Sequence, residues 1–191
     1  DTITGRALDF ISGQHASGNP FYLQLSHYAV HLDIFYNQST LDHLRKRSAG
    51  RKHGMPEFAA MTADMDASIG RILDRLTELK LLRNTYLIFL SDNGGRNTIP
   101  KAPKMKEARN APLRDGKHSF YEGGIRVPFI VLGPGVKPGS VSTVPVTGLD
   151  ILPTLADLAG YRKPLPESMD GGSMRSVFHN AGQGVIRRAR P

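Results

Sequence analysis

The chain has 191 residues, of which 39% are hydrophobic and 22% charged, and its net charge is +8. This length suits one ordinary domain with a sizeable hydrophobic core, and the composition excludes wholesale disorder. No run approaches the roughly 18 apolar residues that cross a bilayer, so no membrane span is predicted. The chain has no cysteine, which excludes disulfides and thiolate metal sites within it.

Apolar runs alternate with amphipathic stretches along the chain, which is typical of an α/β layer architecture. The run from Phe21 to Ser26 follows Asn19-Pro20 and is a candidate buried strand. From Pro56 onward, apolar residues recur every three or four positions, which predicts one face of a long helix and its core packing. These residues are Phe58, Met61, Met65, Ile69, Ile72, Leu73, Leu76 and Leu79.

The strongest strand signal is the near-continuous apolar run at residues 86–90, after a break at Asn84-Thr85. Such a run is typical of a strand covered on both faces. A polar, basic stretch from Arg96 to Arg114 follows. In a compact domain a connection of this length is usually a functional loop.

A third strand is predicted at Pro128–Leu132, closed by Gly133-Pro134-Gly135. Further on, Asp150 is a candidate cap for a short helix. That helix would have Pro153 in its first turn and Gly160 just past its end.

The positive charge is concentrated in clusters that fall in predicted loops or near the ends of the chain. We interpret them first as solvated surface charge and second as a surface that attracts an anionic substrate. Nucleic-acid binding is the weakest interpretation, because no zinc-finger spacing, RNP-like motif or helix-turn-helix accompanies them. The clusters are Arg45–Arg47, Arg51-Lys52, Lys101, Lys104, Lys106, Arg109, Arg187-Arg188 and Arg190.

The segment Ser91–Gly95 directly follows the strongest predicted strand, where open α/β sheets place their ligand sites. Asp92 and Asn93 offer two adjacent oxygen ligands, which suit Ca²⁺ or Mg²⁺ better than zinc. The alternative is a simple turn that closes the strand, because Asp, Asn and Gly favour turns for local reasons. These residues alone leave both interpretations open.

Two further segments contain candidate catalytic side chains. His27–His31 follows the first predicted strand and could present an imidazole as an acid to a leaving group. Lys117 is flanked by flexible residues and could reach an anionic oxygen as a point charge. Taken singly, a loop histidine or lysine is more often plain surface.

Taken together, these motifs resemble the formylglycine-dependent (type I) sulfatase family of the alkaline-phosphatase-like superfamily. The resemblance covers nearly the whole chain, and its motifs occur in the family's order at family-like spacing. It rests on Thr4–Ile11, Pro20–His31, Ala59–Leu82, Ser91–Gly95 (Ser-Asp-Asn-Gly-Gly), Leu113–Pro128 with Tyr-Glu-Gly-Gly-Ile-Arg-Val-Pro, and Asp150–Gly160.

The resemblance implies a fold, a reaction and roles for single residues. The fold would be part of a mixed sheet flanked by helices in three α/β/α layers. Asp92 and Asn93 would be Ca²⁺ ligands, Lys117 would hold a sulfate oxygen, and His31 would face the leaving-group oxygen. The reaction would be hydrolysis of sulfate esters by a formylglycine, with sulfated carbohydrate as the substrate class that the basic loop suggests. The cellular location stays open, and the resemblance alone suggests a periplasmic or secreted one.

The chain also departs from the family pattern. It lacks the Cys-x-Pro-x-Arg or Ser-x-Pro-x-Arg nucleophile motif, Val30 replaces a usual proline, and Asp115 and His118 replace the glycines flanking the lysine. Both ends look cut: we expect residues 1–164 to be a partial catalytic domain and 165–191 a tail leading toward a missing C-terminal subdomain.

We therefore expect the isolated chain to be inactive, and we expect exposed sheet edges to favour self-association. Two alternatives remain open. One is a phosphoester or phosphonate hydrolase of the same superfamily, because metal and lysine would also serve phosphoryl oxygens. The other is a non-catalytic module that binds polyanions.

Overall fold

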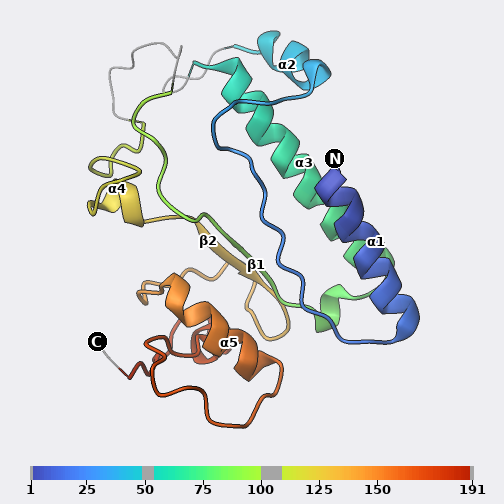
Figure 1. Ribbon diagram of the computed structural model, residues 1–191, viewed down its shortest axis with the longest axis vertical. Coiled ribbons are helices and arrows are strands. Elements are labelled where there is room, and N and C mark those ends of the chain that lie inside the picture. Colours follow the sequence, from blue (N-terminus) through green and yellow to red (C-terminus); the bar gives the residue numbers. More distant parts are fainter. Residues whose placement is uncertain (1, 49–53, 100–108, 190–191) are drawn as a thin grey trace. The chain divides into compact units, whose positions relative to one another are not determined.

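The computed structural model describes residues 2–48, 54–99 and 109–189 (Figure 1). Contacts divide the chain into two compact units. The first comprises Asp1–Leu82 and Leu90–Phe129, and the second comprises Arg83–Phe89 and Ile130–Pro191. Each unit therefore combines two separate stretches of sequence. The predicted boundary near residue 164 does not coincide with this division.

Helices dominate the first unit. They are α1 (Thr2–Ser17), α2 (Gln38–Arg45), α3 (Pro56–Glu78) and the short α4 (Glu122–Ile125). The long helix predicted from Pro56 onward is confirmed: proline occupies its first turn, where a missing N–H costs nothing. Its buried stripe includes Met61, Ile72 and Leu76.

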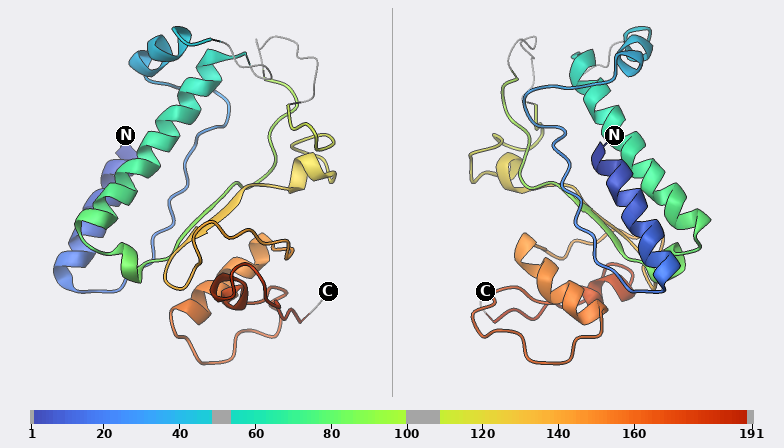
Figure 2. Two further views of the ribbon diagram at one scale, coloured as in Figure 1. Left: turned by 180° about the vertical axis from the view of Figure 1, so that it is seen from behind. Right: turned by 45° about the vertical axis from the view of Figure 1, so that its right-hand side comes forward.

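Helix α1 lies alongside α3 in both figures (Figures 1 and 2). Ala7 and Ile11 of α1 are buried in this interface. Thr4 is also buried, and its hydroxyl lies 2.5 Å from the hydroxyl of Ser68 on α3. Since a buried hydroxyl without a partner is costly, this bond makes the polar contact compatible with the apolar interface.

Helix α2 is attached to α3 through a carboxylate. Asp64 on α3 accepts hydrogen bonds from the Asn37 backbone N–H and the Thr40 hydroxyl, both at 2.6 Å. Asn37 is the N-cap residue just before α2, and its own side chain makes no capping bond. Asp64 therefore accepts the N–H of the N-cap residue, as a side chain in the first turn does in a capping box, but from another helix.

The predicted strand Phe21–Ser26 does not form. The segment is extended, and its residues alternate between half-buried and exposed, but no described strand pairs with it. A strand needs a neighbouring strand to hydrogen-bond its backbone groups. The apolar pattern at Phe21–Ser26 indicates buried side chains but does not indicate such a neighbour.

The second unit contains most of the sheet. Strands β1 (Leu87–Leu90) and β2 (Phe129–Leu132) pair with each other. They run antiparallel, because Tyr86 before β1 lies against Gly133 after β2. Both strands were predicted from sequence. The expected cover on both faces of the strand at Leu87–Leu90 is wrong for the described residues, because none of its four residues is fully buried and Leu90 is 37% exposed.

The other regular elements of the second unit are short helices, and the residue that joins two of them is a buried carboxylate. Its elements are η1 (Leu82–Asn84, which begins in the first unit), η2 (Gly148–Asp150), α5 (Ile151–Leu158) and α6 (Arg175–His179). Asp150 stands before α5 as predicted, with Pro153 in the first turn and Gly160 after the end at φ +78°. Its side chain does not cap α5, however, and instead bonds back to the Thr147 N–H at 2.8 Å.

The predicted tail packs against this helix. The Gly172 N–H donates to Asp150 at 2.9 Å, and the Met174 N–H donates to the buried Thr154 hydroxyl at 2.8 Å. Arg188 donates twice to Asp150, at 2.8 and 2.6 Å. The interpretation of Arg188 as solvated surface charge is therefore wrong, because a fully buried carboxylate needs a cationic partner.

The other basic clusters are only partly visible. Arg45 forms an exposed pair with Glu57 at 2.8 Å. Arg51-Lys52, Lys101, Lys104, Lys106 and Arg190 lie outside the described residues, as does the middle of the stretch predicted as a functional loop. Among the described helices, none is both long and apolar enough to cross a membrane.

Candidate functional site

The loop Ser91–Gly95 leaves the end of β1 and folds on itself. The Ser91 hydroxyl donates to the Asn93 carbonyl at 2.9 Å, and the Asn93 amide donates to the Gly94 carbonyl at 3.0 Å. Asp92 is exposed, and no described residue bonds its carboxylate. Local bonds thus fix the backbone around Asp92 and leave its oxygens available to a ligand.

Gly94 is the point where this loop meets the segment before β2. It is buried, and its N–H donates to the Gly124 carbonyl at 2.8 Å. A Cβ at position 94 would overlap the carbonyl of Gly123 and would come within 2.9 Å of the Gly124 Cα. Only glycine permits this crossing of two backbones.

The loop that carries Lys117 is hydrogen-bonded to the end of the Ser91–Gly95 loop. The Lys117 N–H donates to the Gly95 carbonyl at 2.9 Å, so the lysine backbone is tied to the residue that ends the Ser91–Gly95 loop. The Gly123 N–H donates to the Arg114 carbonyl at 2.8 Å and closes the loop into α4. The Arg114 guanidinium lies 3.6 Å from the centre of the Tyr121 ring, which adds a cation–π contact at its base.

The two residues that replace the family's glycines both have left-handed backbones. Asp115 has φ +63° and His118 has φ +77°. Hydrogen bonds from Asn97, Ser119 and Gly116, together with the charge of Arg114, lower the pKa of Asp115. Asp115 thus gains bonds that partly offset its strained backbone, whereas no described partner bonds the His118 side chain.

His31 is placed in a separate turn. It is exposed, its ring contacts the Tyr28 ring with centres 5.5 Å apart, and its Nδ1 lies 2.7 Å from the Leu32 carbonyl. A carbonyl can only accept, so Nδ1 carries the proton and Nε2 is left to interact outward. In the described part of the chain, no hydrogen bond or ring contact joins this turn to the Asp92 or Lys117 loops.

His27 has a different environment from His31. Its Nε2 is buried without a hydrogen-bond partner among the described residues. Burial, with a smaller effect from the positive N-terminus, lowers the pKa of this imidazole. The lowered pKa favours the neutral imidazole of His27, which is half-buried, whereas His31 is exposed.

Asp92 and Asn93 fit one part of a hard-cation site. They supply a carboxylate and an amide oxygen at adjacent positions of a fixed loop, which is the donor chemistry that Ca²⁺ prefers. Three or more acidic, histidine or cysteine residues do not converge anywhere in the described ranges. The described residues thus provide two ligands of the six to eight that Ca²⁺ usually takes.

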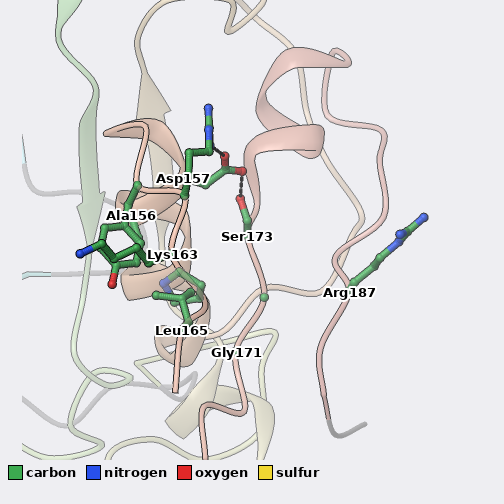
Figure 3. A pocket seen from close by; sticks show the side chains of 11 residues that line it. Ala156, Asp157, Lys163, Leu165, Gly171, Ser173 and Arg187 are labelled. Carbon is green, nitrogen blue, oxygen red and sulfur yellow. Dashed lines mark hydrogen bonds and ion pairs between the residues drawn. The ribbon is translucent and has the colours of Figure 1, made fainter. Parts of the chain in front are cut away.

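A separate hollow of about 360 Å³ lies in the second unit (Figure 3). Asp157 on its wall is already engaged by Ser173 at 2.8 Å and by Arg175 at 3.1 Å. Lys163 and Arg187 extend to opposite sides in Figure 3 and do not converge on one point. This hollow therefore offers no built site for an anion, and the loops around Gly94 remain the candidate.

Sequence reasoning missed the side chains that hold the two loops together. The Asn97 amide donates to the Asp115 carboxylate, and the Asn110 amide donates to the Asp115 carbonyl. Asn110 also donates to the Gly95 carbonyl at 2.8 Å. Both lie within the stretch interpreted as one long loop. The available signal was Asn110-Ala111-Pro112, since asparagine and proline initiate turns.

Comparison with known proteins points to one family. The profile of the family described as Sulfatase matches residues 1–161. A sulfatase of Formosa agariphila is 33% identical over 96% of this chain and 34% of its own length. The N-acetylgalactosamine-6-sulfatase of Sus scrofa is 34% identical over 86% of this chain and 30% of its own length.

Among solved structures, Ps i-CgsB in complex with k-i-k-neocarrahexaose matches with a TM-score of 0.81 and 29% identity. The match covers 95% of this chain and 38% of that one. The chain thus spans about a third of the length of the proteins it matches. The fold is accordingly part of the α/β fold of the alkaline-phosphatase-like superfamily. Because the family profile matches residues 1–161 and the two relatives are 33% and 34% identical to this chain, the chain belongs to the sulfatase family.

Proposed function

We propose that the whole protein hydrolyses sulfate esters and that Asp92, Asn93, Lys117 and His31 are part of its active site. The observation that carries this proposal is the bond from the Lys117 N–H to the Gly95 carbonyl. It holds the backbone of a cationic residue next to the loop with two oxygen ligands. A sulfate group requires positive charge on several oxygens at once, and this junction supports such an arrangement.

Lys117 would hold one sulfate oxygen and offset the negative charge that grows during cleavage. No carboxylate in the described part of the chain pairs with its ammonium group, so an anion need not displace one. Asp92 and Asn93 would be ligands of Ca²⁺. When bound, Ca²⁺ would supply further positive charge at the sulfate oxygens, and a formylglycine elsewhere in the whole protein would supply the nucleophile.

His31 would protonate the departing alcohol oxygen. Its Nδ1–H is held by the Leu32 carbonyl, which orients the ring. Nε2 can donate only when the ring is an imidazolium, so His31 would have to be protonated before cleavage. The exposure of the ring allows it to collect that proton from solvent.

Sulfated carbohydrate is the substrate class that we favour. Two observations support it: the basic residues near the lysine loop, and the similarity to a protein solved with k-i-k-neocarrahexaose. The phosphoester alternative uses the same lysine and metal chemistry. Comparing the turnover of an aryl sulfate with that of an aryl phosphate separates the two.

The test uses the whole protein and matched variants. Lys117→Ala and Asp92→Asn should each lower kcat/KM for an aryl sulfate by about 100-fold or more. Lys137→Ala and Asp9→Asn are the matched controls. They change exposed residues of the same types away from these loops and should leave kcat/KM unchanged. Peptide mapping by mass spectrometry should also find a formylglycine. Full activity in the Lys117 variant would contradict the proposal.

We further propose that the 191-residue chain is inactive on its own. It contains no cysteine to convert to formylglycine, and one loop with two oxygen ligands binds Ca²⁺ weakly. The measurement is aryl sulfate turnover by the purified chain with and without millimolar Ca²⁺. Turnover that follows the purified chain through every column would refute this.

A further inference from the structure

The side-chain amide of Asn110 bridges the two loops of the proposed active site. Its Nδ2 donates to the Gly95 carbonyl at 2.8 Å and to the Asp115 carbonyl at 2.9 Å. The Gly95 carbonyl is also the acceptor of the Lys117 N–H, at 2.9 Å. One carboxamide therefore connects a carbonyl two residues after Asn93 to a carbonyl two residues before Lys117.

A second set of bonds fixes the same short segment from the other side. Asp115 Oδ1 accepts the Gly116 N–H at 2.9 Å and also accepts a bond from the Asn97 amide. A Cβ on Gly116 would lie 2.5 Å from the Asn110 Nδ2 and 2.6 Å from the Asn97 Oδ1. The backbone leading into Lys117 is thus enclosed by two asparagine side chains, with no room to shift toward either.

The enclosure has a chemical consequence for a lysine. Its side chain is long and flexible, so the place its ammonium reaches depends on where its backbone is held. A catalytic group that is misplaced by about 1 Å can lose about 100-fold in rate. Anchoring the backbone at residues 115–117 is the means by which this protein can limit that loss.

We propose that Asn110 is a positioning residue for Lys117. It touches neither substrate nor metal, and it acts by holding the Gly95 and Asp115 carbonyls at the spacing that places the lysine. The inference rests on the proposed role of Lys117 in binding a sulfate oxygen. It goes further because it assigns the control of that role to a residue outside the proposed site.

The test is a double-mutant cycle in the whole protein. Asn110→Asp keeps the size of the side chain but cannot donate to the two carbonyls, and Asn110→Ala removes it. Both should lower kcat/KM for an aryl sulfate by about 10- to 100-fold when Lys117 is present. In a Lys117→Ala background the same changes should cost less than about threefold, since no ammonium remains to be misplaced. Asn84→Ala, an exposed asparagine outside these loops, is the control.

A second measurement does not depend on activity. Hydrogen exchange of the Lys117 amide, followed by mass spectrometry of peptides covering residues 113–118, should be faster in Asn110→Ala than in the parent. Unchanged exchange would overturn the proposal, as would an equal loss of activity in both Lys117 backgrounds. If the parent cleaves no sulfate ester, the proposed function fails, and the exchange experiment still decides whether Asn110 holds the lysine backbone.

Discussion

At the scale of single residues, Asp150 shows how one side chain can connect several parts of the second unit. Its carboxylate is fully buried and accepts bonds from Gly172, Thr147 and Arg188. Burial alone would raise the pKa of Asp150, but these bonds and the guanidinium charge outweigh it and lower the pKa. A single carboxylate thus joins η2, the start of α5 and the last described residues of the chain.

Asp150→Asn should destabilise the protein by about 3 kcal/mol. The amide would direct N–H groups at donors and leave Arg188 without its counter-charge. Chemical denaturation in urea measures this loss. Asp9→Asn on the exposed face of α1 is the matched control and should stay within about 0.5 kcal/mol of the parent. A loss below about 1 kcal/mol at position 150 would show that the bonds contribute little.

His118→Gly should stabilise the protein by about 1 kcal/mol. The change relieves the left-handed backbone at φ +77° and removes no described side-chain bond. Asp115→Gly relieves a similar strain but removes the bonds to Asn97 and Gly116, so it should be neutral or destabilising. Thermal unfolding of both variants decides the matter, and stabilisation by Asp115→Gly alone would reverse the interpretation.

At the scale of elements, α2 depends on α3 for its first turn. Asp64→Ala removes the acceptor of the Asn37 N–H and the Thr40 hydroxyl and should cost about 1–2 kcal/mol. Asp66→Ala, on an exposed position two residues further along the same helix, should be nearly neutral. Urea denaturation measures the free energy of unfolding of both variants. Equal losses would mean that the effect comes from changing any aspartate of α3, and that the bonds of Asp64 to α2 contribute nothing specific.

The helices were easier to predict from sequence than the sheet. The stripe from Phe58 to Leu79 has the period of a helix, and a helix satisfies its own backbone groups, so the local pattern was sufficient. A strand needs a partner that sequence spacing does not identify, which is why β1 and β2 formed while the run at Phe21–Ser26 did not.

The same distinction applies to the candidate site. The Asp92-Asn93 pair and Lys117 were recognisable because they sit in contiguous motifs. Their junction was not, since it depends on bonds between residues 15 or more positions apart, such as Gly95 with Asn110 and Asn97 with Asp115. The bond of Arg188 to Asp150, 38 positions away, was hidden for the same reason.

At the scale of the whole molecule, acid should destabilise the fold. The pKa values of Asp64, Asp115, Asp150 and Asp157 are all lowered from an ordinary value of 3.8, because hydrogen bonds made in the folded state outweigh the opposing effect of burial. A carboxylate with a lowered pKa contributes its stability above the unfolded value. That contribution is lost as the pH falls through the folded value.

The midpoint of thermal unfolding should therefore be steady at about pH 5 to 7 and fall below about pH 4. In Asp150→Asn the whole curve should be lower but its acid limb shallower, because one of the titrating groups is gone. Circular dichroism across the pH range measures both curves. An acid limb of unchanged steepness in the variant would show that Asp150 does not contribute to it.

Self-association also belongs to this scale. Leu90, Ile130 and Leu132 of the two strands are exposed, and the described two-stranded sheet has no further strand on either side. Unpaired edges with apolar side chains favour edge-to-edge contact, so the purified chain should form concentration-dependent oligomers. Light scattering over a dilution series tests this, and a constant monomer mass would contradict it.

The division into two units carries one more consequence, for anyone who wishes to cut or recombine the chain. Arg83–Phe89 belongs with Ile130–Pro191, although 40 residues of the other unit separate them in sequence. Within this small stretch, the Tyr86 hydroxyl bonds the Pro134 carbonyl at 2.7 Å and the His179 ring at 2.8 Å. A shortened chain that begins at residue 130 would lose both bonds, and one that ends at residue 129 would keep Tyr86 without its partners. No single cut yields both units intact, so a piece of this chain meant for expression should include them together.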